Sequence, residues 1–90
     1  MKTAASLSSA LTPQQKMIYE LAKSGRGSVE FLDVGRGEHR RSCLGIVTEN
    51  IDACLERAAA RGLHGGRFAV MGLRGVVYWP DVPTPAEYTH

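Results

Sequence analysis

The sequence predicts a small α+β domain in which three helices are followed by a C-terminal β-hairpin. Periodic apolar residues with recognisable start and stop signals predict the two longer helices at 13–24 and 49–61. Two apolar, β-prone runs near the C-terminus, separated by the loop GLRG, predict the hairpin. The chain has 90 residues, which is enough for one domain and too few for two.

The first helix is expected at 13–24, after a loose polar leader at 1–11. The stretch TPQQ favours a helix start, because Thr12 and Gln15 have the spacing of a capping box and a proline stands at the first helical position. Gly25 follows Lys23 and Ser24 and can end the helix in a left-handed conformation.

Residues 25–37 read GRGSVEFLDVGRG, a β-prone run between two glycine-rich turns. The run predicts a short strand at 28–34, although Ser28 is also suited to cap a single helical turn. Beyond the second turn, apolar residues after a basic cluster predict a short helix at 38–46. Gly45 limits the length of that helix.

The second long helix is expected at 49–61. Thr48 is suited to cap its start, and acidic residues occupy its first turn, where the helix dipole favours them. The residues that follow this helix also carry a recognisable stop signal. Gly62 at the position after the cap and the apolar Leu63 behind it are the components of a Schellman motif.

Two β-prone runs, RFAVM and VVYWP, follow a glycine-rich stretch. They predict an antiparallel hairpin with a four-residue loop at 72–75, which would place Leu73 and Arg74 at its tip. The last segment, PDVPTPAEYTH at 80–90, contains three prolines in six residues. It is expected to be an extended arm, either disordered or lying on a partner.

The charge is mildly basic. The formal net charge is +2, but residues 1–79 hold all eleven Lys and Arg, which leaves an excess of four positive charges there. This excess permits a nucleic-acid partner without requiring one. No apolar stretch reaches the ~20 residues that cross a bilayer, and no secretory signal is visible, so a cytoplasmic protein without a membrane partner is expected.

Two cysteines and two histidines could be combined into a zinc site or a Cys–His nucleophile. Cys43 and Cys54 lack the close Cys-x-x-Cys pairing of structural zinc sites, and nothing orients them towards His39 or His64. Buried thiols are therefore expected, with no metal, no cofactor and no enzymatic activity.

The order of elements resembles the winged helix-turn-helix domain over residues 12–79. The stretch LERAAARGLHGGRFAVMGLRGVVYW carries most of the resemblance, because a helix runs through a Gly-Leu turn into two strands. The resemblance implies a positioning helix at 38–46, a recognition helix at 49–61 and a wing tip at 72–75.

A winged-helix protein of this kind would bind double-stranded DNA as a homodimer and regulate transcription. Asn50 would read adenine, and Arg57 would read guanine or contact phosphate. Charged residues beside a glycine turn can also be merely solvated, as is expected for Arg26. The resemblance implies DNA contacts at eight residues: Arg36, Arg40, Arg41, Thr48, Asn50, Arg57, Arg67 and Arg74.

Three carboxylates on the recognition helix argue against that function. Glu49, Asp52 and Glu56 would be repelled by phosphates. The alternative is a protein-binding adaptor or inhibitor, of the kind found in phages and mobile elements, with the same fold and no DNA binding. Of Tyr78 and Trp79, one is expected in the core, and the other is suited to a partner or dimer contact.

Overall fold

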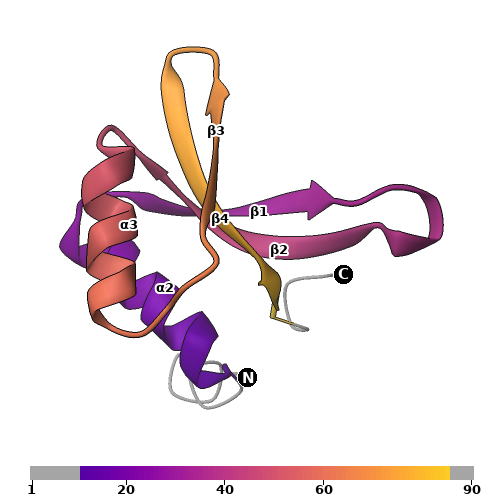
Figure 1. The fold of residues 1–90 in the computed structure, drawn as a ribbon, viewed down its shortest axis with the longest axis horizontal. Coiled ribbons are helices and arrows are strands. Elements are labelled where there is room, and N and C mark those ends of the chain that lie inside the picture. The colour runs from indigo at the N-terminus through magenta and orange to yellow at the C-terminus, as the bar shows by residue number, and fades with distance from the viewer. Residues whose placement is uncertain (1–10, 86–90) are drawn as a thin grey trace, which may run out of the picture.

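The computed structural model describes residues 11–85 and has an α+β fold, with two α-helices and a four-stranded antiparallel sheet (Figure 1). In chain order the elements are α2 (Pro13–Ser24), β1 (Ser28–Val34), the one-turn 3-10 helix η1 (Gly37–His39), β2 (Arg41–Thr48), α3 (Ile51–Ala60), β3 (Arg67–Met71) and β4 (Arg74–Pro83). The predicted helix at 13–24 and the predicted strand at 28–34 are confirmed.

The strand order in the sheet is β1-β2-β4-β3. Each neighbouring pair is antiparallel, so β2 and β3 run in the same direction with β4 between them. Since α3 connects β2 to β3, these elements form a split β-α-β unit. The β1–β2 and β3–β4 hairpins extend in different directions from the central β2–β4 pair (Figure 1).

The core lies between the helices and one face of the central strands. In the β2–β4 register Leu44 is paired with Trp79, and Ile46 with Val77. All four side chains are fully buried, and each aliphatic one contributes about 1.5–3 kcal/mol of transfer free energy. The helices cover them with four buried residues: Ile18, Leu21, Ala22 and Ala58.

The capping box at the start of α2 is confirmed. The Gln15 N–H donates to Thr12 Oγ1 at 3.2 Å, and the Thr12 N–H donates to Gln15 Oε1 at 2.8 Å. Gln15 also has a tertiary role, because its Nε2 donates to the Pro83 carbonyl at 2.7 Å. This buried amide therefore ties the first helix to the end of the last strand.

Helix α3 confirms the predicted helix but begins later than 49. Asn50 is its N-cap, and its side chain accepts from the Ala53 N–H at 3.1 Å. Thr48, the expected cap, is the last residue of β2, and its hydroxyl accepts from the Asn50 N–H at 3.1 Å. The threonine thus positions the capping asparagine instead of capping the helix itself.

The end of α3 has the predicted Schellman motif. The Leu63 N–H donates to the Ala58 carbonyl at 2.9 Å, and the Gly62 N–H donates to the Ala59 carbonyl at 3.0 Å. Gly62 has a φ of 87°, a conformation that favours glycine. Leu63 and Ala58 are both buried, so the motif fixes the exit of the chain towards β3.

The expected fold of three helices with a C-terminal hairpin wing is wrong, because residues 38–46 form η1 and most of β2. A short apolar run is compatible with either a buried strand or a helix. Here the run pairs with β1 on one side and β4 on the other, so it forms a strand. Leu44 lies between Phe31 of β1 and Trp79 of β4. A Cβ at Gly45 would come within 3 Å of neighbouring atoms, so that glycine permits close packing in the sheet.

The hairpin loop is shorter than the predicted four residues. Met71 pairs with Arg74, so only Gly72 and Leu73 form the loop, and Arg74 begins β4. Gly72 has a φ of 66°, whereas the backbone of Leu73 has no positive φ. A positive φ confined to the first loop residue is the pattern of a type II′ turn, which suits the twist of a hairpin.

The start of the arm expected at 80–90 is a packed element. Strand β4 continues through it after an irregularity in its pairing with β2. Val82 is buried in the core, and the Thr84 N–H donates to the Ser42 carbonyl at 3.2 Å. Residues 86–90, and the first ten residues of the expected leader, lie outside the described residues.

We expect Gln15→Ala to lower the free energy of unfolding by about 1–3 kcal/mol, because it removes the side-chain half of the capping box and the hydrogen bond from Nε2 to the Pro83 carbonyl. Gln14→Ala, at an exposed position of the same helix, is the matched control and should change stability by less than ~0.5 kcal/mol. Urea unfolding followed by circular dichroism measures both. Equal stabilities of the two variants would contradict the tertiary role of Gln15.

Candidate nucleic-acid interface on the open face of the sheet

The face of the sheet opposite the helices, here called the open face, is the candidate site. Successive strand residues alternate between faces, so Gly45 and Tyr78 lie opposite the core residues beside them. A Cβ at Gly45 would lie 2.6 Å from Leu32 Cδ1 and 3.1 Å from Tyr78 Cβ, which places the three residues together. Cys43 and Val76 are buried on this face without belonging to the core beneath the helices.

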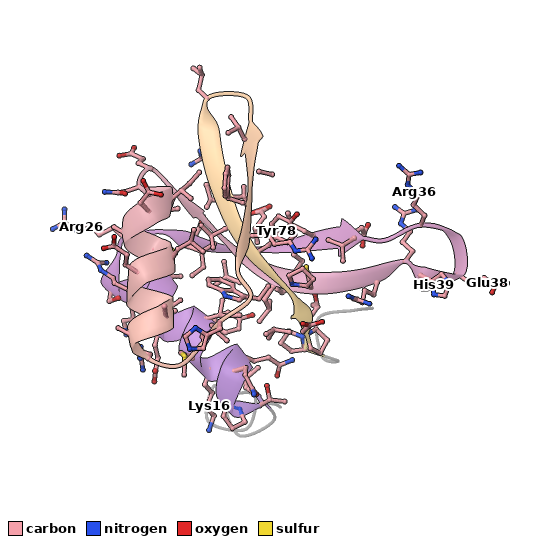
Figure 2. All side chains as sticks on the ribbon, in the orientation of Figure 1. Lys16, Arg26, Arg36, Glu38, His39 and Tyr78 are labelled. Atoms are coloured by element: carbon pink, nitrogen blue, oxygen red, sulfur yellow. The ribbon has the colours of Figure 1, made fainter. Side chains whose placement is uncertain are left out.

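Tyr78 and Arg67 lie side by side on the open face. Tyr78 is half-buried, and Figure 2 shows it near the crossing of the two hairpins. Arg67 is directly opposite it in the β3–β4 register and is exposed. Among residues 11–85, the Arg67 side chain has no ion pair or hydrogen-bond partner. An aromatic ring beside an uncommitted guanidinium can hold a planar base and an adjoining phosphate.

Arg41 extends this basic region along the open face. Its Nε donates to the Pro80 carbonyl at 3.1 Å, which holds the side chain in place. Its nearest carboxylate is Asp81, at 3.8 Å and with a side chain 98% exposed. Such an exposed pair is weak, so a phosphate can replace the aspartate. Arg41 lines one groove together with Arg67, Tyr78 and His39.

A second groove lies at the start of β1 and the base of the β3–β4 loop. Arg26 and Arg74 line it, and Glu49 is also among its lining residues. Arg26 is the one non-glycine residue of the described chain with a positive φ, at 58°. The sequence predicts a merely solvated Arg26, whereas the structure places it in a groove with a second arginine.

Three of the expected DNA contacts, Arg36, Arg40 and Arg41, are close in the sequence but have different surroundings in the structure. Arg36 lies at the tip of the β1–β2 hairpin, as Figure 2 shows. Arg40 is bonded to Asp33 on β1 at 3.3 Å, and this pair is exposed. Arg41 alone lines the groove beside Tyr78.

The residues expected to read DNA from the recognition helix lie on the helix side of the sheet. Thr48 and Asn50 take part in the start of α3, as described above. Arg57 lies against the end of α2, because a Cβ at Gly25 would be 3.0 Å from its Nη1. These three residues share a small pocket with core side chains, whereas Tyr78 lies outside it.

The acidic residues of α3 are separated from the open face. Asp52 and Glu56 are exposed on the helix, whose buried Ala58 packs against the core. They therefore project away from the sheet and do not repel a ligand bound at Tyr78. Two carboxylates of the described residues do share this side, since Asp81 lines the groove with Tyr78 and Glu30 continues the row of Arg67, Tyr78 and Gly45 onto β1. Arg67, the basic residue of this row, lies on β3, at the opposite end of the row from Glu30.

The two cysteines are free thiols on different elements. Burial raises the pKa of Cys43, an effect that Arg41 opposes and Asp33 reinforces. Burial also raises the pKa of Cys54 on α3, where Arg57 opposes it. Within the described residues, no three or more His, Cys, Asp or Glu side chains are grouped so that they could hold a metal ion.

Comparison with family models, curated proteins and solved structures gave no match to the chain. The resemblance to the winged-helix family therefore has no independent test, and it has lost the element order on which it depended. Within residues 11–85, neither helix has the length and apolar character needed to cross a bilayer.

We expect both thiols to react slowly with an aromatic disulfide reagent, and Cys43 at least about tenfold more slowly than Cys54, because the thiolate is the reactive form and Cys43 is fully buried. The absorbance of the released thiol measures both rates in the native protein and in urea. A Cys54→Ser variant isolates Cys43. Rapid modification of that variant in its native state would contradict the burial of Cys43.

Proposed function

We propose that the protein binds single-stranded nucleic acid on the open face of its sheet. Tyr78 stacks on a base, while Arg67 and Arg41 contact the phosphates beside it. The observation that carries the proposal is the half-buried Tyr78 paired across the strands with an arginine that has no described partner. Stacking of bases on aromatic residues of an antiparallel sheet is a common mode of single-strand recognition.

A single strand suits this surface better than a duplex. The faces of the bases in a duplex are stacked on each other, so a tyrosine on a sheet can reach a base only when the strand is unpaired. The double-strand recognition expected from the sequence relies on the helix at 49–61 entering the major groove. Helix α3 has its N-terminal polar groups engaged in capping and exposes Asp52 and Glu56.

The distribution of charge also favours binding on the open face. Arg41 and Arg67 lie in one groove with Tyr78, and the one acidic residue of that groove, Asp81, is weakly paired. Two or three phosphate contacts give moderate affinity that depends strongly on salt. A role in transcription and a cytoplasmic location remain predictions from the sequence.

We expect a labelled oligo-dT of about 20 nucleotides to bind at low salt, with an affinity that falls as salt rises. Tyr78→Ala should weaken binding about tenfold or more, whereas Tyr78→Phe should retain most of it, because the ring and not the hydroxyl stacks. Arg67→Ala should lower the slope of log K against log salt by about 0.7. Fluorescence anisotropy measures each quantity.

Arg57→Ala is the matched control, because it removes an arginine from the helix side of the molecule and should leave binding unchanged. Circular dichroism of each variant confirms that it is folded. The proposal fails if the oligonucleotide does not bind at low salt. It also fails if Arg57→Ala weakens binding while Tyr78→Ala does not, since that result would place the site on α3.

A further inference from the structure

The outer strand of the β3–β4 hairpin has an unusual exposed surface. Phe68 is 61% exposed and Val70 is 69% exposed, and both lie on the same face of β3. Side chains of α3 reach Gly75, opposite Val70, and Gly66, just before the strand, yet they leave Phe68 and Val70 exposed. The loop end of the hairpin extends past α3 (Figure 1). Neighbouring exposed apolar residues on a strand indicate a surface that another chain covers.

The backbone of β3 is also open on one side. Within residues 11–85, β3 is the last strand of the sheet and has β4 as its one neighbour. A two-residue loop closes on a hydrogen-bonded pair, here Met71 and Arg74. Hydrogen-bonded and non-bonded pairs then alternate along the hairpin, so Phe68 and Val70 direct their N–H and C=O groups to the free edge. The two exposed side chains thus belong to the residues with outward backbone groups.

The two edges of the sheet differ in how they are protected. The other edge strand, β1, carries Glu30 and Asp33, and charges of this kind discourage pairing with another chain. Strand β3 has the sequence RFAVM, with one charge at its start and neither an acidic residue nor a proline. Pairing through a sheet edge is therefore favoured at β3.

We propose that β3 pairs antiparallel with β3 of a second copy of this chain, with the two-fold axis at Ala69. This register places Phe68 opposite the partner's Val70, and Val70 opposite the partner's Phe68. Each pair exchanges two backbone hydrogen bonds, and the exposed apolar side chains cover each other. The inference does not depend on the proposed nucleic-acid binding.

Charge is compatible with this pairing. Arg67 is the one charged residue of β3, and antiparallel symmetry separates it from the partner's Arg67 by about 14 Å along the strands. This exceeds the screening length of about 8–10 Å at moderate salt, so the two arginines do not oppose the dimer. Residues opposite each other point to the same face, so the two open faces become one continuous surface.

The dimer should be weak. Five paired residues from each copy are far fewer than the roughly 20–30 of a standard interface, which places the affinity in the micromolar range. Sedimentation velocity over a range of concentrations is therefore the suitable measurement. We expect a shift from 9.8 kDa to twice this mass as concentration rises. A mass that stays at the monomer value up to ~0.5 mM would overturn the proposal.

Two lysine substitutions locate the interface. Val70→Lys puts a charge opposite the partner's Phe68 and should abolish the dimer. Leu73→Lys is the matched control, since it makes the same kind of change at a fully exposed residue in the loop, outside the paired strand, and should leave the dimer intact. A dimer that survives Val70→Lys, or that only Leu73→Lys disrupts, would overturn the assignment to β3.

A cysteine substitution tests the register. In the proposed dimer the two copies of Ala69 face each other as a non-hydrogen-bonded pair, with Cβ atoms about 4.5–5.5 Å apart, close to disulfide range. Ala69→Cys should form a cross-linked dimer under mild oxidation, whereas Leu73→Cys should not, because the loops lie at opposite ends of the interface. The unsubstituted chain supplies the background from its native thiols. Faster cross-linking through Leu73→Cys would overturn the register.

Discussion

The structure depends on the pairing of β2 with β4, which aligns Leu44 with Trp79 and Ile46 with Val77 on one face. Both helices pack against this face, and their buried residues belong to the same cluster. Because the two strands are central in the sheet, every other element is placed relative to them. The consequence is a domain with helices on one side and, across the described residues, an open sheet face on the other.

This one-sided arrangement determines which polar groups can act together. The alternation of side chains along β4 buries Trp79 and turns Tyr78 to the open face, where β3 and β2 bring Arg67 and Arg41 beside it. The same layering puts the acidic residues of α3 on the far side of the sheet. The strand order also leaves β3 at the edge of the sheet beside β4, so the free edge lies next to the candidate site.

Local signals in the sequence predicted part of this structure. The capping box at Thr12 and the Schellman motif at Gly62 act within a few residues, and both are confirmed. The helix predicted at 38–46 is wrong because the pairing of β2 with β1 and β4 is non-local and leaves no local signal. The sequence also indicated that one of Tyr78 and Trp79 is buried, but which of the two depends on the face that the helices cover. Arg67 was expected to bind phosphate, but its place opposite Tyr78 follows from register alone.

The central claim is that the open face, and not α3, holds the ligand. An NMR titration of the isotope-labelled chain with a short single-stranded oligonucleotide tests it most directly. We expect the ring signals of Tyr78 to shift first, together with backbone amides of β2, β3 and β4 near Arg41 and Arg67. The indole signal of the buried Trp79 and the amides of α3 should move little. Shifts concentrated at the start of α3, or no shifts at low salt, would contradict the account.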